Sequence, residues 1–423
     1  MSTPAVAPRW SGVDGTATTE FLLRFARTGH RAGYTTAELE ERIELLARAL
    51  GVRDVEASAT PTVVEIALGP FAGQQTFTLR VRPSTVDLGA IADLDDLVAD
   101  VLDERLDAPA ALERLAAVEA TPISRPYPVM LAAYVGAAVV LTPMLGGGRD
   151  EALAAGIVGA VTGVVAIAGG KSSRLESIVA PLAAIAAAFT ASIVAQAGLG
   201  ASRDLVTLAA LVPLLPGMTL TVGMRELASK QLQSGVANTA DALFQLLGLV
   251  FGVEIGRSVA DAILSTPTDA VPRHATSLTQ AVCAGLAGLA FTGTLRARTR
   301  DAPLMCAATL LALCAKATGT NLLGPQLGVF AGALAVGATG AVVGGWLRRS
   351  PLVFIVPGVL MLVPGSLGLR SVLQLLTNET VGGLTAGVDT LVTAGSIAYG
   401  LMIAATVLPR PLLGRVPHVI RRG

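Results

Sequence analysis

The chain has 423 residues, of which 52% are hydrophobic and only 15% are charged, and its mean hydropathy is +0.64. Soluble domains carry about 25% charged residues, so the composition excludes an ordinary soluble protein and indicates an integral membrane protein. The formal net charge of zero hides an uneven division, because residues 1–125 hold 19 of the 31 acidic residues and 12 of the 31 basic ones. The first part therefore predicts a soluble acidic domain, and nothing indicates a nucleic-acid partner.

This first part, residues 1–125, is expected to be a small α+β cytoplasmic domain. After a loose start, residues 34–52 predict a helix, because Thr35 and Glu38 form a capping box at its beginning. The β-rich runs 63–68 and 76–81 predict strands. A second amphipathic helix follows, marked by Leu94, Leu97, Val101 and Leu106. No apolar segment of signal-peptide length begins the chain, so we expect this domain to stay in the cytoplasm.

The rest of the chain is predicted to cross a membrane ten times. A membrane-spanning helix needs about 20 apolar residues, and stretches of about this length recur at 128–146, 151–169, 177–197, 205–222, 239–256, 277–295, 302–317, 324–347, 351–367 and 384–408. We expect two five-helix sets, residues 126–262 and residues 263–423, the second ending in a basic tail. With both termini inside, thirteen basic residues lie in the cytoplasmic loops and tail and six in the outer loops. This satisfies the positive-inside rule and predicts cytoplasmic termini at the cell membrane.

The two sets are expected to be inverted repeats. Spans one and six begin 149 residues apart, and Asp241 precedes Asp389 by 148 residues. Because each set holds an odd number of spans, the second must enter the membrane from the opposite side. Inverted repeats are typical of secondary transporters, whose substrate sites lie near broken helices at the midplane.

Proline-glycine pairs interrupt the apolar runs of both sets. The stretch "LLPGMTLTVGMREL" contains Pro216-Gly217 and ends in the charged pair Arg225-Glu226, and "FIVPGVLMLVPGSLGLRSVL" contains Pro357-Gly358 and a second pair, 364–365. Proline removes an amide donor, which a bilayer tolerates only beside other protein or a watery cavity. We expect half-helices that line a central cavity and meet a zwitterionic solute. Two ordinary proline kinks are the alternative.

Each set also carries one acid at the head of a polar stripe. Asp241, Gln245, Gly248 and Gly252 follow the same helical spacing as Asp389, Thr393, Ser396 and Gly400. A carboxylate within a span is costly and is a functional candidate; it can exchange a proton for the ammonium group of an outgoing solute. Helix capping by both acids is the alternative. The candidates for substrate binding or coupling are Pro216, Gly217, Arg225, Glu226, Asp241, Gln245, Pro357, Gly358, Asp389, Thr393 and Ser396.

Four stretches carry a resemblance to a known family: "AGYTTAELEERIELLARALGV" followed by "TPTVVEIAL", then "LGGGRDEALAAGIVGAVTG", "LLPGMTLTVGMRELASKQLQSGVANTADAL" and "FIVPGVLMLVPGSLGLRSVLQLL". From about residue 17 to Leu408, the chain resembles the threonine/serine exporter family, with both membrane modules fused in one polypeptide. The resemblance implies a ten-span exporter of small hydroxy amino acids, driven by an ion gradient. Only the segment from Pro216 to Glu226 and the pair Pro357-Gly358 are carried over as family features.

Other classes of function stay open at this point. A membrane-anchored sensor that binds a ligand through the acidic domain is one. An intramembrane aspartyl protease is another, since it needs two acids on neighbouring helices, although "TAD" and "GVD" are not its usual motifs. The acidic domain has no phosphate loop or nucleophile motif. The three histidines lie outside the predicted spans, and the three cysteines lack metal-ligand spacing. We therefore expect no enzyme, cofactor or metal, and leave open whether the chain forms a homo-oligomer.

Overall fold

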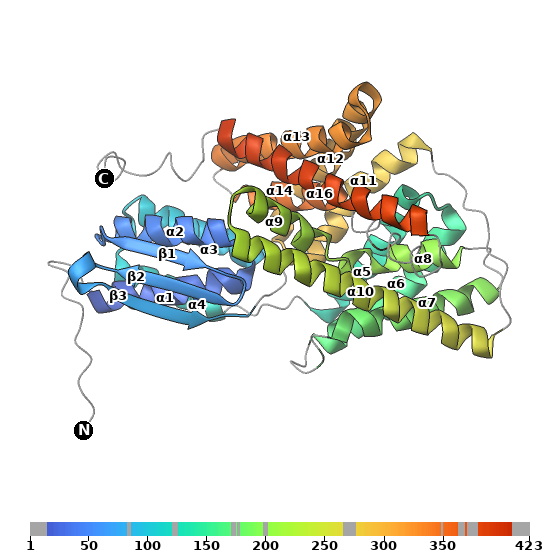
Figure 1. Cartoon of the computed structure of the whole chain (residues 1–423), viewed down its shortest axis with the longest axis horizontal. Coiled ribbons are helices and arrows are strands. Elements are labelled where there is room, and N and C mark those ends of the chain that lie inside the picture. Colours follow the sequence, from blue (N-terminus) through green and yellow to red (C-terminus); the bar gives the residue numbers. More distant parts are fainter. Residues whose placement is uncertain are drawn as a thin grey trace.

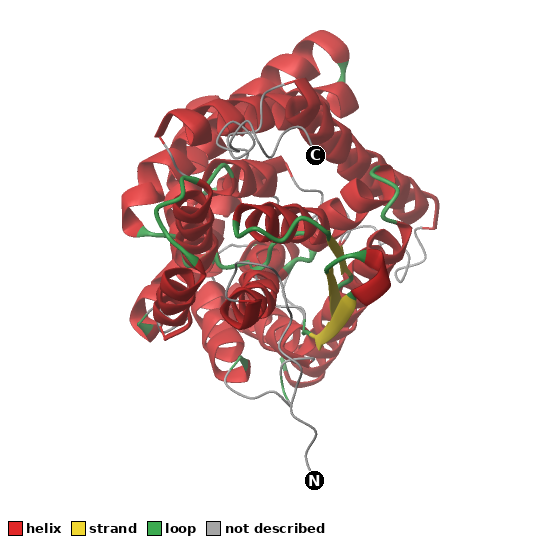
Figure 2. Cartoon of the chain, turned by 90° about the vertical axis from the view of Figure 1, so that its left-hand side faces the viewer, coloured by secondary structure: helices red, strands yellow, loops and turns green. Residues whose placement is uncertain are grey.

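The computed structural model describes residues 15–82, 86–120, 126–170, 175, 178–197, 202–264, 276–347, 350–362, 369 and 380–407. They form two parts that lie side by side in Figure 1: an N-terminal unit (residues 15–120) and a helical part (residues 126–407). Figure 2 shows that the molecule consists mostly of helices and that the strands are confined to one side of it. The two parts are in contact, and the candidate site lies where they meet.

The N-terminal unit packs helices on one face of a small sheet. Strands β1 (Val55–Ala59), β2 (Val63–Leu68) and β3 (Gln75–Arg80) pair antiparallel in that order, and a short 3-10 turn, η1 (Phe71–Gly73), connects the last two. In β2, Val64, Ile66 and Leu68 are buried while Glu65 is exposed, as expected for a strand with one face against the core. The helices are α1 (Gly15–Ala32), α2 (Thr36–Ala49), α3 (Leu88–Leu102) and α4 (Ala108–Ala120).

The α+β character of this unit and the start of its second helix are confirmed. Thr35 caps α2, where its hydroxyl accepts a hydrogen bond from the Glu38 amide and the Glu38 carboxylate accepts one from the Thr35 amide. The expected loose start is wrong from Gly15 onward. That segment is helix α1, which buries Phe21 and Phe25 completely in the core.

The helical part consists of α5 (Tyr127–Leu141), η2 (Thr142–Leu145), α6 (Arg149–Gly169), α7 (Val179–Gln196), α8 (Arg203–Leu211), η4 (Val212–Leu214), α9 (Gly217–Ala228), α10 (Leu232–Ile263), α11 (Ser277–Thr294), η5 (Thr299–Asp301), α12 (Ala302–Leu323), α13 (Pro325–Leu347), α14 (Leu352–Leu362) and α16 (Thr380–Val407). Within the described residues, seven helices are long and apolar enough to cross a membrane, and the bent pair α8–α9 raises this number to eight. Two shorter apolar helices, α11 and α14, coincide with the remaining predicted spans. The chain is a helical, polytopic membrane protein.

The two halves of the helical part share one packing order. In the first half α5 packs on α6, α6 on α7 and α7 on α10, while α8 contacts both α6 and α7. In the second half α11 packs on α12, α12 on α13 and α13 on α16, while α14 contacts both α12 and α13. The close crossings also correspond: Gly252 of α10 lies against Ala184 of α7, and Gly400 of α16 lies against Ala333 of α13. The glycine ends of the two polar stripes therefore serve helix packing.

Candidate functional site

The first proline-glycine pair breaks a membrane span, as predicted. The segment from Arg203 to Leu214 and helix α9 meet at an angle of 55°. Pro216 is the N-cap residue of α9, and its carbonyl oxygen accepts the hydrogen bond of the Leu220 amide at 3.0 Å. Pro216 and Gly217 are both buried. The break directs α9 away from the axis of α8, so that its last turn points to the N-terminal unit (Figure 1).

The second pair does not break its helix. Pro357 lies inside α14, which continues from Leu352 to Leu362. A side chain at Gly358 would come within 2.6 Å of Val336 on α13, so this glycine allows close packing. The 148-residue spacing that relates Asp241 to Asp389 pairs Pro216 with Pro364, and the pair Pro364-Gly365 lies outside the described residues.

A pocket lies at the junction of α9, α14 and the N-terminal unit, and we call it the junction pocket. Its empty volume is about 520 Å³, including space open to solvent. The N-terminal unit contributes Gly33, Thr35, Glu38, Val86 and Ile91. The helical part contributes four residues of α9, Met218, Thr221, Val222 and Arg225, four of α14, Leu352, Ile355, Val356 and Val359, and Leu401 of α16. The four proline and glycine candidates are absent from this lining, but the helices that carry them form its walls.

Arg225 and Glu38 are the charged residues of this lining. Their closest atoms, Arg225 Nη1 and Glu38 Oε1, are 3.6 Å apart, and the side chains are 30% and 15% exposed. The other Glu38 oxygen, Oε2, accepts the Thr35 amide. The remaining lining is apolar apart from Thr35, Thr221 and Gly33. The pocket therefore presents one cation and one anion side by side on an otherwise uncharged surface.

Glu226, the next residue, links the two parts of the molecule. Its side chain is 2% exposed and accepts hydrogen bonds from Thr36 Oγ1 of α2 and from Asn238 Nδ2 of α10, both at 2.6 Å. Beside it, Gln231 Nε2 donates to Glu40 at 3.1 Å. The sequence singled out Arg225 and Glu226 but missed their partners Thr36, Glu38 and Glu40, because some 190 residues separate the two sides and the capping box explained Glu38 locally.

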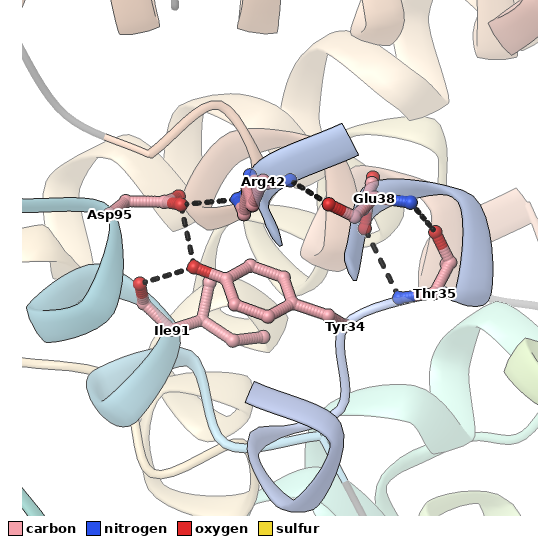
Figure 3. A network of polar contacts seen from close by, with 6 residues as sticks. All are labelled: Tyr34, Thr35, Glu38, Arg42, Ile91 and Asp95. Atoms are coloured by element: carbon pink, nitrogen blue, oxygen red, sulfur yellow. Dashed lines mark hydrogen bonds and ion pairs between the residues drawn. The ribbon is translucent and has the colours of Figure 1, made fainter. Parts of the chain in front are cut away.

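A buried polar network holds the beginning of α2 in place (Figure 3). Asp95 of α3 accepts hydrogen bonds from the Tyr34 hydroxyl at 2.6 Å and from Arg42 Nε at 2.9 Å. The Arg42 guanidinium lies 4.2 Å above the Tyr34 ring and donates to the Glu38 carbonyl oxygen. Burial, together with the nearby Asp95 carboxylate, raises the pKa of Tyr34 well above its usual range, so the hydroxyl remains a donor. The network fixes the orientation of Thr35 and Glu38.

A second contact joins the N-terminal unit to the connection between α11 and α12. Arg298 donates to Asp93 and, at 2.9 Å, to Asp96, both on α3. The Leu88 amide donates to the carbonyl oxygen of Leu295 at 3.0 Å. Among the described residues, polar contacts therefore hold the unit at the end of α9 with the start of α10 and at this connection, and α3 also packs against α14.

The two acids of the polar stripes lie elsewhere. Asp241 is ten residues into α10 and Asp389 is also inside its helix, α16, so the capping alternative is wrong. Both side chains are exposed, and Gln245 Nε2 donates to Asp241 at 2.6 Å. On α16, Thr393 is buried and the Ser396 hydroxyl donates to the Val392 carbonyl oxygen. None of these five residues lines the junction pocket.

Comparison with known proteins gives the family. A family model described as "Putative threonine/serine exporter" matches residues 20–260, more than half of the chain, and one described as "Threonine/Serine exporter, ThrE" matches residues 280–407. The chain belongs to the threonine/serine exporter family. The first match covers the N-terminal unit and α9, and the second covers α14, so residues of both regions line the junction pocket.

Two exporters of this family are similar along most of the chain. The "Probable threonine/serine exporter" of Mycobacterium tuberculosis (strain ATCC 25618 / H37Rv) is 26% identical over 97% of this chain and 81% of its own length. The "Threonine/serine exporter" of Corynebacterium glutamicum is 22% identical over 76% of this chain and 67% of its own length. No solved structure matches the chain. The resemblance stated from the sequence is confirmed, and the chain is a multi-pass membrane protein of an exporter family.

Proposed function

We propose that this chain is a secondary active transporter that exports small amino acids, threonine and serine among them, across the cell membrane. The observation that carries the proposal is the junction pocket. It lies between a broken span and α14 of the other half, and it pairs a cation with an anion. A zwitterionic amino acid requires both charges in a site. The names of two relatives, both threonine/serine exporters, support this substrate class.

The transport unit in this proposal has ten spans arranged as two inverted repeats, with both termini in the cytoplasm. The shared packing order of the two halves supports a repeat. Basic residues at the end of the helical part that faces the N-terminal unit, Arg225, Arg296 and Arg298, support a cytoplasmic location for this end, since cytoplasmic loops are rich in lysine and arginine. Movement of one five-span repeat against the other would then open the site to each side of the membrane in turn, as in other secondary transporters with inverted repeats.

Asp241 and Asp389 are proposed to couple export to proton entry. Each lies on a helix of the apolar length expected for a span, with exposed apolar neighbours such as Phe244 and Val388. An ionisable side chain in such surroundings is costly, and transporters retain such groups for proton or ion movement. Their equivalent positions in the two halves support a shared role.

The test is transport by the purified chain in liposomes. A panel of labelled amino acids is loaded inside or outside, with and without a pH gradient, and threonine and serine should move fastest and respond to the gradient. Asp241→Asn or Asp389→Asn should flatten the pH dependence while substrate exchange continues. Asp54→Asn, an exposed acid of the N-terminal unit, is the matched control. Binding without flux would refute the transporter and favour the membrane-anchored sensor.

A further inference from the structure

We infer that the junction pocket is an amino-acid site in which Arg225 binds the α-carboxylate of the substrate and Glu38 binds its α-ammonium group. This assignment rests on the proposed function, because it names the residues that recognise the exported solute. Its two charged ligands come from different parts of the molecule: Glu38 from α2 of the N-terminal unit and Arg225 from the last turn of α9. The site is therefore complete only when the N-terminal unit is docked.

The spacing of the two charges fits such a ligand. Arg225 Nη1 and Glu38 Oε1 are 3.6 Å apart, which is longer than the roughly 2.7–2.9 Å of a short charge-assisted hydrogen bond. An amino acid carries its opposite charges on one carbon, so it can lie across this pair on the pocket side, with its carboxylate against Arg225 and its ammonium group against Glu38. Arginine suits the carboxylate because its planar fork binds both oxygens.

Glu38 is held by a hydrogen bond outside the pocket, and the helix turn that carries Arg225 is held by its neighbour Glu226. Glu38 Oε2 is engaged by the Thr35 amide at 3.3 Å, which leaves Oε1 directed at the pocket. Helix α2 is itself fixed by the Tyr34, Arg42 and Asp95 network that Figure 3 shows. The neighbouring Glu226 is bound to Thr36 and holds the last turn of α9 against α2.

The rest of the lining selects the side chain of the substrate. Val222, Ile355 and Val356 supply apolar lining in the same pocket as the charged pair. Thr221 also lines the pocket, and its hydroxyl donates to the Gly217 carbonyl oxygen at 2.9 Å, so its oxygen can still accept a hydrogen bond. A short side chain with one hydroxyl satisfies both features, which is the chemistry of threonine and serine.

The experiment measures binding to the full chain in nanodiscs by calorimetry, using three probes. L-Threonine carries both charges, 1-amino-2-propanol lacks the carboxylate and 3-hydroxybutyrate lacks the ammonium group. The unmodified chain should bind threonine about 10- to 100-fold more tightly than either analogue, because each analogue lacks the partner of one partly buried charged group. Arg225→Gln should lose the preference over the amine and keep the preference over the acid. Glu38→Gln should show the opposite pattern.

Two further variants separate recognition from folding. Arg225→Lys keeps the positive charge but not the planar fork, so it should retain a smaller preference for threonine over the amine than the unmodified chain shows. Arg298→Gln weakens the other contact of the N-terminal unit, outside the pocket, and should change the affinity for all three probes by one common factor. Unchanged probe preferences in Arg225→Gln and Glu38→Gln would overturn the assignment. Complete loss of the preference for threonine over the amine in Arg225→Lys would also overturn it. If those variants keep their preferences while liposomes still export threonine, the site is wrong and the transporter stands. If crossed preferences appear without any flux, the site stands and the transporter is wrong.

Discussion

The hydrogen bond between Thr36 and Glu226 should control how firmly the N-terminal unit is docked. Thr36→Val removes the hydroxyl donor and keeps the shape of the side chain. Both residues are buried, at 6% and 2% exposure, so water cannot easily replace the lost donor. A hydrogen bond to a charged group contributes about 1.5–3 kcal/mol. Because 1.4 kcal/mol corresponds to a factor of ten, the undocked population should rise by about 10- to 150-fold.

Hydrogen exchange of the full chain in nanodiscs measures this change. The reporter is the Leu88 amide, which is bonded to Leu295 at the second contact and is far from the substitution in sequence. If the unit undocks as one body, exchange at Leu88 should accelerate by the same factor, since exchange reports the free energy of local opening.

Thr28→Val is the matched control for the docking experiment. It removes a similar bond, from the Thr28 hydroxyl to Glu119 at 2.8 Å, that lies entirely within the N-terminal unit. Exchange at Leu88 should not change in this variant. Unchanged exchange at Leu88 in Thr36→Val would refute the reasoning, because the two contacts would then open independently.

Three other predictions concern topology, packing and pH. In a chain whose cysteines 283, 306 and 314 are replaced, a membrane-impermeant thiol reagent applied to intact cells should label Asp204→Cys and spare Lys230→Cys; the reverse pattern contradicts cytoplasmic termini. Gly400→Val should lower the thermal stability in detergent by the equivalent of about 1–3 kcal/mol, because the new Cβ would lie 2.8 Å from the Phe330 carbonyl oxygen. Gly136→Ala is the control and should be tolerated, because its Cβ would lie 3.9 Å from the Ala290 Cβ. Burial lowers the pKa of His30 below its usual 6.5. The unfolded chain therefore binds a proton at this histidine more readily than the folded chain, and the stability should fall as the pH drops below 6.5. In melting temperatures measured over a series of pH values, His30→Gln should reduce this loss.

Features with a local cause were predictable from the sequence. The capping box of α2 depends on two side chains three residues apart, and the strand at Val63 alternates buried and exposed positions over its own length. The helix at residues 15–32 was also visible, because Phe21, Leu22 and Phe25 recur at helical spacing. Its first turn has no acidic residue, which weakens the local signal for its beginning.

The helices that carry the two acids were predicted in the right places but with the wrong beginnings. The apolar stretch places the beginning of this span at residue 239, after the polar residues Ser234 and Asn238. The helix begins at Leu232 instead, since a helix can continue beyond the apolar layer with polar residues that have partners. Ser234 Oγ contacts the Ala59 carbonyl oxygen, and Asn238 binds Glu226. Those partners stabilise the polar first turns of α10, which hydropathy does not predict.

The charged pair that follows the break illustrates what sequence cannot supply. Hydropathy predicts that Arg225 and Glu226 end a span, and proline chemistry predicts the break before them, but neither indicates the surface that they meet. That surface is the capped start of α2, which is positioned by the buried pair Arg42 and Asp95. Leaving Glu226 buried without its donors would cost about 1–3 kcal/mol or more for each group, so the end of α9 and the start of α2 stabilise each other. The 55° bend at Pro216 is what directs the end of α9 to this surface. A straight span would end along the axis of α8, and the two charges of the junction pocket would then lie on separate surfaces.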